Sequence, residues 1–346
     1  MSATPAPPLQ QAIRQLAMGG SLSEPQAREA FGTVMRGEAT PAQVAALLVG
    51  LRVKGETADE VAGAADALRG AMVRLPADRP DLLVDTCGTG GGSVGTFNIS
   101  TAAALLAAGL GVRIAKHGNR SFTSQCGSAD VLEALGVPIE VSLDVMERAL
   151  AQAGIVFMYA PLMHPAMRHV GPVRRELGIP TVMNIVGPLA NPASAGRQVV
   201  GVADAARVPL IAGALQSLGA VHALVVHGAP GMDEVSPLGL TQVVEIRDGS
   251  TREWSVDPTH FGFPSGRAED LAGGPPAENA SAVLAVLRNE ATPTAVAAVV
   301  LNAAAALYVS GSGPTDFGDA VEHALAGLRA GAGINALERL RAAYLR

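Results

Sequence analysis

Aromatic side chains and cysteines are scarce in this sequence. Aromatic residues make up only 3% of the 346 residues, so the core must be built mainly from Ala, Val and Leu. The two cysteines, Cys87 and Cys126, cannot form a disulfide framework or a zinc site by themselves. We interpret both as reduced packing residues.

The sequence also lacks basic runs and membrane-length apolar runs. Without a basic run, the net charge of −6 argues against nucleic acid or an anionic membrane as a partner. The longest apolar run, residues 295–309, is interrupted by Asn302 and is too short to span a bilayer comfortably. Residues 1–8 lack the charged and apolar regions of a signal peptide. We expect a cytoplasmic protein with no nucleic-acid partner and no membrane partner.

Two patterns divide the chain. Residues 9 to about 75 show helical periods, with helix starts at Ser23, at Thr40-Pro41 and at Thr57 with Glu60. From Asp81 onward, strand and helix candidates alternate, which predicts a largely parallel sheet with helices on both faces. The strand candidates are 82–86, 112–115, 155–159, 198–202, 221–227 and 242–246, with a hairpin over 245–256. The helix candidates are 99–109, 128–136, 142–153, 205–218, 276–289, 292–309 and 316–344.

The expected fold class is α/β, with a small helical N-terminal domain and a larger α/β domain around a mostly parallel sheet. We place the helical domain at 1–77 and the α/β domain at 78–346. Residues 161–192 interrupt the alternation, because they are helical at first and then irregular and rich in proline. A crossing of this segment back to the helical domain would complete that domain and place a cleft between two lobes.

The segment from Asp85 to Thr101 is the most informative motif. Glycines at 88 and 90–92 follow a predicted strand, and Asn98, Ser100 and Thr101 lie where the next helix begins. Glycines let backbone N–H groups turn toward a ligand, and a helix start is electropositive. The segment therefore suits a phosphate or diphosphate.

Two other interpretations of this loop are less consistent with its surroundings. Gly90-x-Gly92-x-x-Gly95 fits a dinucleotide fingerprint, but the next predicted strand ends in Lys116 instead of an acidic residue. A P-loop would need Gly-Lys-Ser/Thr after the glycines, and none follows. A tight turn without a ligand is the remaining alternative.

Polar residues also follow the strand candidate 112–115. Lys116 is a suitable point charge for a phosphate, and Asn119 offers neutral hydrogen bonds. His117 could be structural or functional. Ser128 occupies the expected cap position of the next helix, and could serve as an N-cap, as a phosphate contact, or as both.

Arg174 lies on the edge of an apolar stripe if residues 165–178 form a helix. Met167, Val170, Val173 and Leu177 share that face, whereas Arg175 points away from it. A guanidinium in that position needs an anionic partner, either a ligand carboxylate or a buried Asp or Glu. Pro172 weakens the expectation of one continuous helix, because it removes an intrahelical bond.

Asp233 and Glu234 are adjacent carboxylates after the strand candidate 221–227. Such a pair at the carboxyl end of a strand suits Mg²⁺ that is also bound by a substrate phosphate. By itself the pair could equally be a solvated surface feature.

Together these motifs resemble the anthranilate phosphoribosyltransferase family over nearly the whole chain. The resemblance is carried, in the family's order, by 88–91 with 98–101, by 116–121, by 164–167 with Arg174, and by 232–236. It implies Mg²⁺-dependent transfer of the 5-phosphoribosyl group from phosphoribosyl pyrophosphate (PRPP) to the anthranilate amine, in tryptophan biosynthesis. The products would be N-(5-phosphoribosyl)anthranilate and diphosphate. The resemblance also implies the helical-plus-α/β fold and a homodimer.

The resemblance implies roles for individual residues. The implied catalytic residues are Lys116, Asp233 and Glu234, and the implied Mg²⁺ ligands are Ser100, Asp233 and Glu234. The implied PRPP contacts are Gly88, Thr89, Gly90, Gly91, Thr96, Asn98, Ser100, Thr101, Lys116 and Ser128. The implied anthranilate contacts are Gly88, Asn119, His164, Arg174 and Pro188, with Arg174 meeting the carboxylate. One departure is Gly92, where the family often has Asp, so a metal or ribose contact from this position stays open.

Two alternative functions remain at this point. A pyrimidine-nucleoside phosphorylase of the same superfamily would lack the Asp-Glu pair and would use phosphate as its nucleophile. A non-catalytic nucleic-acid-binding relative would need a basic patch, and the net charge of −6 argues against one.

Overall fold

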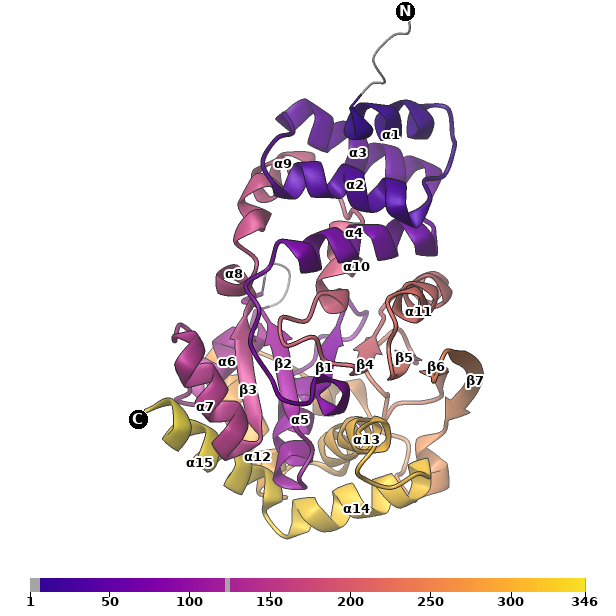
Figure 1. Cartoon of the computed structure of the whole chain (residues 1–346). Coiled ribbons are helices and arrows are strands. Elements are labelled where there is room, and N and C mark those ends of the chain that lie inside the picture. Colours follow the sequence, from indigo (N-terminus) through magenta and orange to yellow (C-terminus); the bar gives the residue numbers. More distant parts are fainter. Residues whose placement is uncertain (1–6, 122–124, 346) are drawn as a thin grey trace, which may run out of the picture. The chain divides into compact units, whose positions relative to one another are not determined.

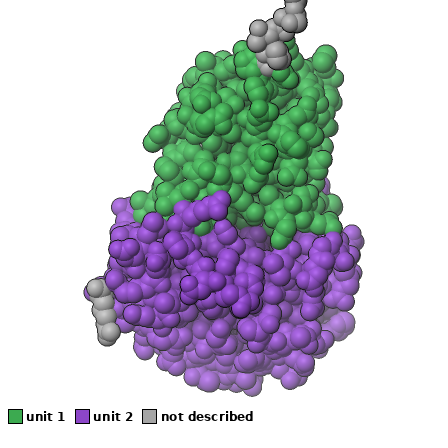
Figure 2. All heavy atoms as spheres, viewed as in Figure 1, with its two compact units in different colours: residues 1–73, 161–192, 209–219 green, residues 74–160, 193–208, 220–346 purple. Residues whose placement is uncertain are grey.

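The computed structural model describes residues 7–121 and 125–345, which form two compact units (Figure 2). Unit 1 comprises residues 1–73, 161–192 and 209–219 of the chain, and unit 2 comprises residues 74–160, 193–208 and 220–346. Residues 209–219 lie outside the segments predicted for the helical domain. In the described residues, no helix combines the length and the apolar character needed to cross a bilayer.

Unit 1 begins with four helices, and the starts of the last three agree with the predicted caps Ser23, Thr40 and Thr57. They are α1 (Pro8–Ala17), α2 (Glu24–Met35), α3 (Pro41–Lys54) and α4 (Ala58–Gly70). The Thr57 hydroxyl accepts the Glu60 N–H at 3.3 Å, and the Glu60 carboxylate accepts the Thr57 N–H at 2.8 Å. These reciprocal bonds satisfy two backbone donors that a helix start would otherwise leave unpaired.

The later segments of unit 1 are shorter than the sequence predicts. They contain α8 (Ala160–Met163), a 3₁₀ turn (Pro165–His169), α9 (Gly171–Leu177), α10 (Met183–Val186), a 3₁₀ turn (Gly187–Leu189) and most of α11 (Val208–Ser217). The expectation of one helix over 165–178 is wrong. Pro172 stands in the first turn of α9, where its missing N–H costs nothing, so a new helix begins there.

Unit 2 contains one seven-stranded sheet within the described residues, in the order β3-β2-β1-β4-β5-β6-β7 (Figure 1). The strands are β1 (Val84–Gly88), β2 (Ile114–Gly118), β3 (Ile155–Tyr159), β4 (Arg197–Gly201), β5 (His222–Gly228), β6 (Thr241–Arg247) and β7 (Ser250–Val256). The first five are parallel and the last two pair antiparallel. The predicted α/β fold class is confirmed, and so is the hairpin, whose turn residues Asp248 and Gly249 both have positive φ.

Three predicted boundaries need correction. β1 and β2 begin two residues later than predicted and continue to Gly88 and Gly118, so Lys116 lies inside a strand. A 3₁₀ turn over Pro80–Leu82 occupies the start of the predicted first strand. The predicted helix 316–344 is two helices, α14 (Phe317–Arg329) and α15 (Ala332–Tyr344), because Gly331 between them adopts the left-handed conformation at φ 74°.

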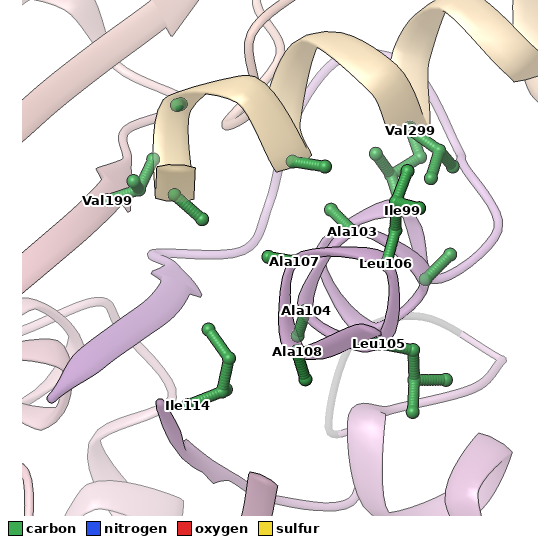
Figure 3. Close-up of a cluster of buried hydrophobic side chains, with 14 of the residues drawn as sticks. Ile99, Ala103, Ala104, Leu105, Leu106, Ala107, Ala108, Ile114, Val199 and Val299 are labelled. Carbon is green, nitrogen blue, oxygen red and sulfur yellow. The ribbon is translucent and has the colours of Figure 1, made fainter. Parts of the chain in front are cut away.

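The core of unit 2 is built from small and branched aliphatic side chains, as expected. α5 (Ile99–Gly109) and α13 (Pro293–Val309) pack against each other, and Figure 3 shows side chains of α5 between Val299 of α13 and Ile114 of β2. Further helices, α6 (Ser128–Ala134), α7 (Leu143–Ala153) and α12 (Pro276–Leu287), complete the unit. This packing fixes the start of α5 directly after the glycine segment.

Candidate active site

The glycine loop lies at the carboxyl edge of the parallel strands, where the chain order reverses. β1 pairs with β2 on one side and β4 on the other, so its end is a topological switch point. Gly88 is in register with Gly201, and Gly201 with Val226 near the end of β5. The loops after β1, β4 and β5 therefore meet at one edge.

Asp233 contacts the glycine loop. Its Oδ2 accepts the Gly90 N–H at 2.8 Å. A Cβ at Gly88 would collide with the Asp233 carboxylate, and a Cβ at Gly201 would collide with the Asp233 carbonyl oxygen. The absence of side chains at these two positions is therefore what lets Asp233 reach the loop.

Gly92 stands where the family often has Asp, and the structure shows how much space surrounds it. A Cβ at Gly92 would lie 3.1 Å from the Gly231 carbonyl oxygen and 3.3 Å from Asp233 Oδ1. The arrangement thus leaves little space for a larger residue at this position, and an acidic one would stand beside the Asp233 carboxylate.

Glu234 and Ser100 line the same small cavity, with Asn302 on its wall. Enclosure by protein atoms, with the neighbouring charge of Asp233, raises the pKa of Glu234 to about 8. Lys116 and a hydrogen bond from the Ser100 backbone oppose that increase. The surrounding side chains thus do not fully balance the negative charge of Asp233 and Glu234. A bound divalent cation would supply the missing positive charge.

Lys116 lies beneath the loop and is only 3% exposed. Its Nζ donates to the Thr86 carbonyl oxygen at 2.6 Å and to Ser100 Oγ at 3.3 Å. Burial lowers the pKa of Lys116, although Asp85, Cys87 and Glu234 act in the opposite direction. The expectation that Lys116 ends a strand is wrong, because β2 continues to Gly118. The ammonium bonds protein oxygens under the loop, and its contact with a phosphate stays a prediction.

The residues at the start of α5 are held firmly. Asn98 is the N-cap, and its side chain donates to the Cys126 carbonyl oxygen at 3.3 Å and accepts from Asn279 at 2.9 Å. Thr101 is buried, and its hydroxyl has no hydrogen-bond partner among the described residues. Before the helix, the Thr89 N–H donates to Gly201 and Thr96 forms an isolated bridge with Ala272.

Asn119 and Ser128 also belong to unit 2. The Asn119 carbonyl oxygen accepts the Ser128 hydroxyl at 3.4 Å. The prediction that Ser128 caps its helix is wrong, because Gly127 is the N-cap and α6 begins at Ser128. Helix starts are difficult to place to one residue when glycine and serine are adjacent, since both are accepted as caps.

Three of the implied anthranilate contacts, His164, Arg174 and Pro188, belong to unit 1. Arg174 is half-buried, and its guanidinium donates to Asn184 Oδ1 at 3.4 Å. None of the ion pairs between described residues involves Arg174, so the alternative of a buried carboxylate partner finds no support. Burial alone lowers the pKa of Arg174, the direction expected for a cation without a matching anion.

His164 is 5% exposed, and burial lowers its pKa to about 4, against a hydrogen bond with the Ala190 backbone. It is therefore neutral at pH 7 and weakly basic. Pro188 lies in the 3₁₀ turn Gly187–Leu189, partly exposed.

The described residues contain no cluster of three or more His, Cys, Asp or Glu side chains suited to a metal. The implied Mg²⁺ donors are instead two carboxylates and the Ser100 hydroxyl. Mg²⁺ keeps several waters and binds through one or two carboxylates together with substrate phosphates, so this sparse oxygen set fits the ion.

Asn302 is a residue of this region to which the sequence motifs gave no role at the site. Its amide accepts the Val235 N–H at 2.9 Å and donates to the Val235 carbonyl oxygen at 2.9 Å, directly after Glu234. The available signal was a polar residue inside the apolar run 295–309. A buried amide is expected to have such partners, although sequence alone cannot name them.

Comparisons with known proteins agree with this geometry. Residues 10–72 match the model of a glycosyl transferase family helical bundle domain, and residues 80–334 match that of a glycosyl transferase family α/β domain. The anthranilate phosphoribosyltransferase of Rubrobacter xylanophilus is 49% identical over 331 residues, covering 96% of this chain and 96% of that protein. This chain belongs to the anthranilate phosphoribosyltransferase family.

Solved structures of the anthranilate phosphoribosyltransferase family show the same fold. The enzyme from Thermus thermophilus superposes with a TM-score of 0.90 at 41% identity, covering 97% of this chain and 99% of that one. The Saccharomyces cerevisiae enzyme in complex with PRPP and Mg has a TM-score of 0.87 at 26% identity, with 97% and 98% covered. The predicted family and fold are thus confirmed, and family membership favours this activity over the phosphorylase alternative.

Proposed function

We propose that the chain transfers the 5-phosphoribosyl group of PRPP to the amine of anthranilate in a Mg²⁺-dependent reaction of tryptophan biosynthesis. The products are N-(5-phosphoribosyl)anthranilate and diphosphate. The observation that carries the proposal is the gathering of Asp233, Glu234, Ser100 and Lys116 beside the glycine loop at the carboxyl edge of the sheet. A family relative that binds PRPP and Mg supports it.

PRPP is assigned to the glycine loop and the start of α5. Loop N–H groups and an electropositive helix start suit a diphosphate. The Thr101 hydroxyl, which has no partner within 7–121 and 125–345, is a further donor in this region. The proposed contacts are Gly88, Thr89, Gly90, Gly91, Thr96, Asn98, Ser100, Thr101, Lys116 and Ser128. Lys116 is buried below the loop and bonds Ser100, so the contribution proposed for it is a fixed positive charge close to the diphosphate.

Ser100, Asp233 and Glu234 are the residues that would hold Mg²⁺. Bound there, Mg²⁺ would offset the negative charge that builds on diphosphate as it leaves the ribose. Lys116 adds positive charge from below, and Asn302 fixes the backbone that carries Glu234. The carboxylates and the ammonium are thus oriented before substrate arrives, so little reorganisation is needed during the reaction.

Anthranilate is assigned to Gly88, Asn119, His164, Arg174 and Pro188. The charge of Arg174 meets only a neutral amide oxygen within the described residues, so it remains available for a ligand carboxylate. His164 is neutral at pH 7 and, with a pKa of about 4, is poorly matched to accept a proton there. Because the anthranilate amine is itself neutral, catalysis rests on positioning and electrostatics, without a covalent intermediate.

The test is a fluorescence assay of anthranilate consumption with purified protein, PRPP and Mg²⁺. We expect consumption only when both substrates and the cation are present. A folded protein that consumes no anthranilate under these conditions would contradict the proposal. Phosphorolysis of a pyrimidine nucleoside with inorganic phosphate, measured in parallel, would instead support the phosphorylase alternative.

We also propose a homodimer, on the family resemblance alone. Light scattering coupled to size-exclusion chromatography tests it, and a mass equal to one chain at micromolar concentration would contradict it.

A further inference from the structure

A single carboxylate joins two parts of the chain that each carry a proposed substrate contact. Asp130, in the first turn of α6, accepts the Ser121 N–H at 3.2 Å and the Gly127 N–H at 2.8 Å, both on Oδ2. Its other oxygen, Oδ1, accepts Arg120 at 2.8 Å. Residues 122–124 lie outside the described residues, and these bonds join the chain on either side of them.

The two chain segments touch closely at this point. A Cβ at Gly127 would collide with the Ser121 nitrogen and the Asn119 carbonyl oxygen. That same oxygen accepts the Ala129 N–H at 3.2 Å and the Ser128 hydroxyl at 3.4 Å. Asn119 and Ser128 are therefore in direct contact at a closely packed junction, and the Asp130 carboxylate accepts a backbone N–H from each side of it.

Arg120 completes the junction and is not available for a phosphate. Besides Asp130, its guanidinium pairs with Glu133 at 2.6 Å and lies 5.9 Å from the centre of the Tyr159 ring. Burial raises the pKa of Asp130, but hydrogen bonds from Gly127 and Arg120 outweigh burial and the pKa is lowered overall. Asp130 thus stays ionised and can accept from all three donors at neutral pH.

We infer that Asp130 is a positioning residue for both substrates. By tying Ser121 and Gly127 to one carboxylate, it sets where Asn119, a proposed anthranilate contact, lies relative to Ser128, a proposed PRPP contact. This inference rests on the proposed function. Asn119 and Ser128 are proposed to bind substrate, so displacing them should weaken substrate binding more than it slows the chemical step.

The experiment compares D130A and D130N with E133Q in the full chain. Glu133 is the matched control, because it pairs with the same arginine but its carboxylate takes no backbone N–H among the described residues. KM for anthranilate, KM for PRPP, kcat per folded molecule and thermal midpoint are measured for each variant. PRPP binding is also measured by calorimetry, which needs no turnover.

We expect D130A to raise both KM values about tenfold, to weaken PRPP binding in parallel, and to change kcat less than about threefold. D130N keeps one acceptor oxygen and should lie between D130A and wild type, whereas E133Q should stay within about twofold of wild type. If D130A does not fold, D130N decides alone.

Unchanged KM values in D130N and D130A, with only a lower thermal midpoint or a smaller folded fraction, would overturn the inference and leave Asp130 as a helix cap. Equal KM effects in E133Q would assign the effect to Arg120 instead, which also overturns it. Failure of the proposed function has a different signature, since the wild-type protein would then consume no anthranilate at all.

Discussion

Two glutamates near opposite ends of β5 have contrasting environments. Glu234 follows β5 at the carboxyl edge, beside the glycine loop, whereas Glu245 lies in β6, opposite Leu224 near the start of β5. The pKa of Glu234 is raised to about 8, first by burial and then by Asp233. Burial would also raise the pKa of Glu245, but hydrogen bonds from Arg252, His222 and Tyr308 outweigh it, so that pKa is lowered.

The partners of Glu245 explain this difference. Its Oε1 lies 2.9 Å from His222 Nε2 and accepts Tyr308 at 3.0 Å, and its Oε2 accepts Arg252 at 2.8 Å and Trp254 at 2.9 Å. Both oxygens are thus fully used by the protein itself, which is the usual condition for a buried carboxylate that supports the fold. Glu234 instead stands beside a second carboxylate, which is the condition for a ligand site.

The largest loss of activity should come from removing the carboxylate of Glu234 or Asp233, whose negative charges the protein does not balance. We expect E234A and D233A each to lower kcat/KM by at least about 100-fold and to raise the Mg²⁺ concentration needed for activity, because both are assigned to the cation. Steady-state kinetics over a Mg²⁺ titration measures this. E253A, an exposed glutamate of β7, is the control. Unchanged Mg²⁺ titration curves in both variants would count decisively against the metal assignment.

Removing the carboxylate of Glu245, whose two oxygens are both hydrogen-bonded, should lower the stability of the fold instead of the activity. E245A leaves His222 and Tyr308 as buried groups without their anionic partner, and we expect the free energy of unfolding to fall by about 3–5 kcal/mol. Urea denaturation measures it, with E253A expected to change by less than about 0.5 kcal/mol. Activity per folded molecule should be retained. A loss of activity at unchanged stability would contradict the contrast between Glu245 and Glu234, since Glu245 would then act at the active site and not in the fold.

Arg174 is a cationic side chain that, like Glu234, has no full charge partner among the described residues. Because it meets only Asn184 in the described residues, we expect R174A to raise KM for anthranilate by about one to two orders of magnitude, the value of a charge-assisted pair. KM for PRPP should be nearly unchanged. R175A is the control on an exposed neighbour and should change neither value more than about twofold. A selective rise in KM for PRPP would mean that Arg174 binds phosphate.

The smallest expected effect is a pH dependence of Mg²⁺ binding, which depends on the protonation of Glu234. A carboxyl group whose pKa is raised to about 8 is mostly protonated below that pH and must lose its proton to bind a cation. The apparent affinity should therefore rise about tenfold per unit between pH 6 and pH 8 and level off above it. Calorimetry with Mg²⁺ alone tests this. E234Q should abolish the slope, and a flat profile in the wild type would show that Glu234 is already ionised.

Local signals made several features predictable. The caps at Thr40 and Thr57, the hairpin turn at Asp248-Gly249 and the full extent of α5 depend on residues within a few positions of each other. Their backbone conformations are set by side chains close in sequence, so each was predicted with its mechanism. The site motifs were equally local, which is why the glycine loop and the Asp233-Glu234 pair could be selected.

Contacts between distant residues could not be predicted in the same way. Asn302 bonds Val235 across 67 positions, and Lys116 bonds Thr86 across 30. Lys116 was expected directly after a strand, but β2 continues to Gly118, so Lys116 lies inside the strand and beneath the loop. Pattern alone locates strand ends only to within a few residues, which is the size of this error.

The sequence by itself determined the α/β class, the glycine loop at a strand end and the family to which the chain belongs, because these follow from local composition and motif order. Only the tertiary structure decided the electrostatic state of the charged groups. Whether Glu234 or Glu245 is left in need of positive charge depends on how many donors converge on it from other elements. That convergence is set by packing of segments far apart in the chain, and the free energy of a buried charge depends on those neighbours.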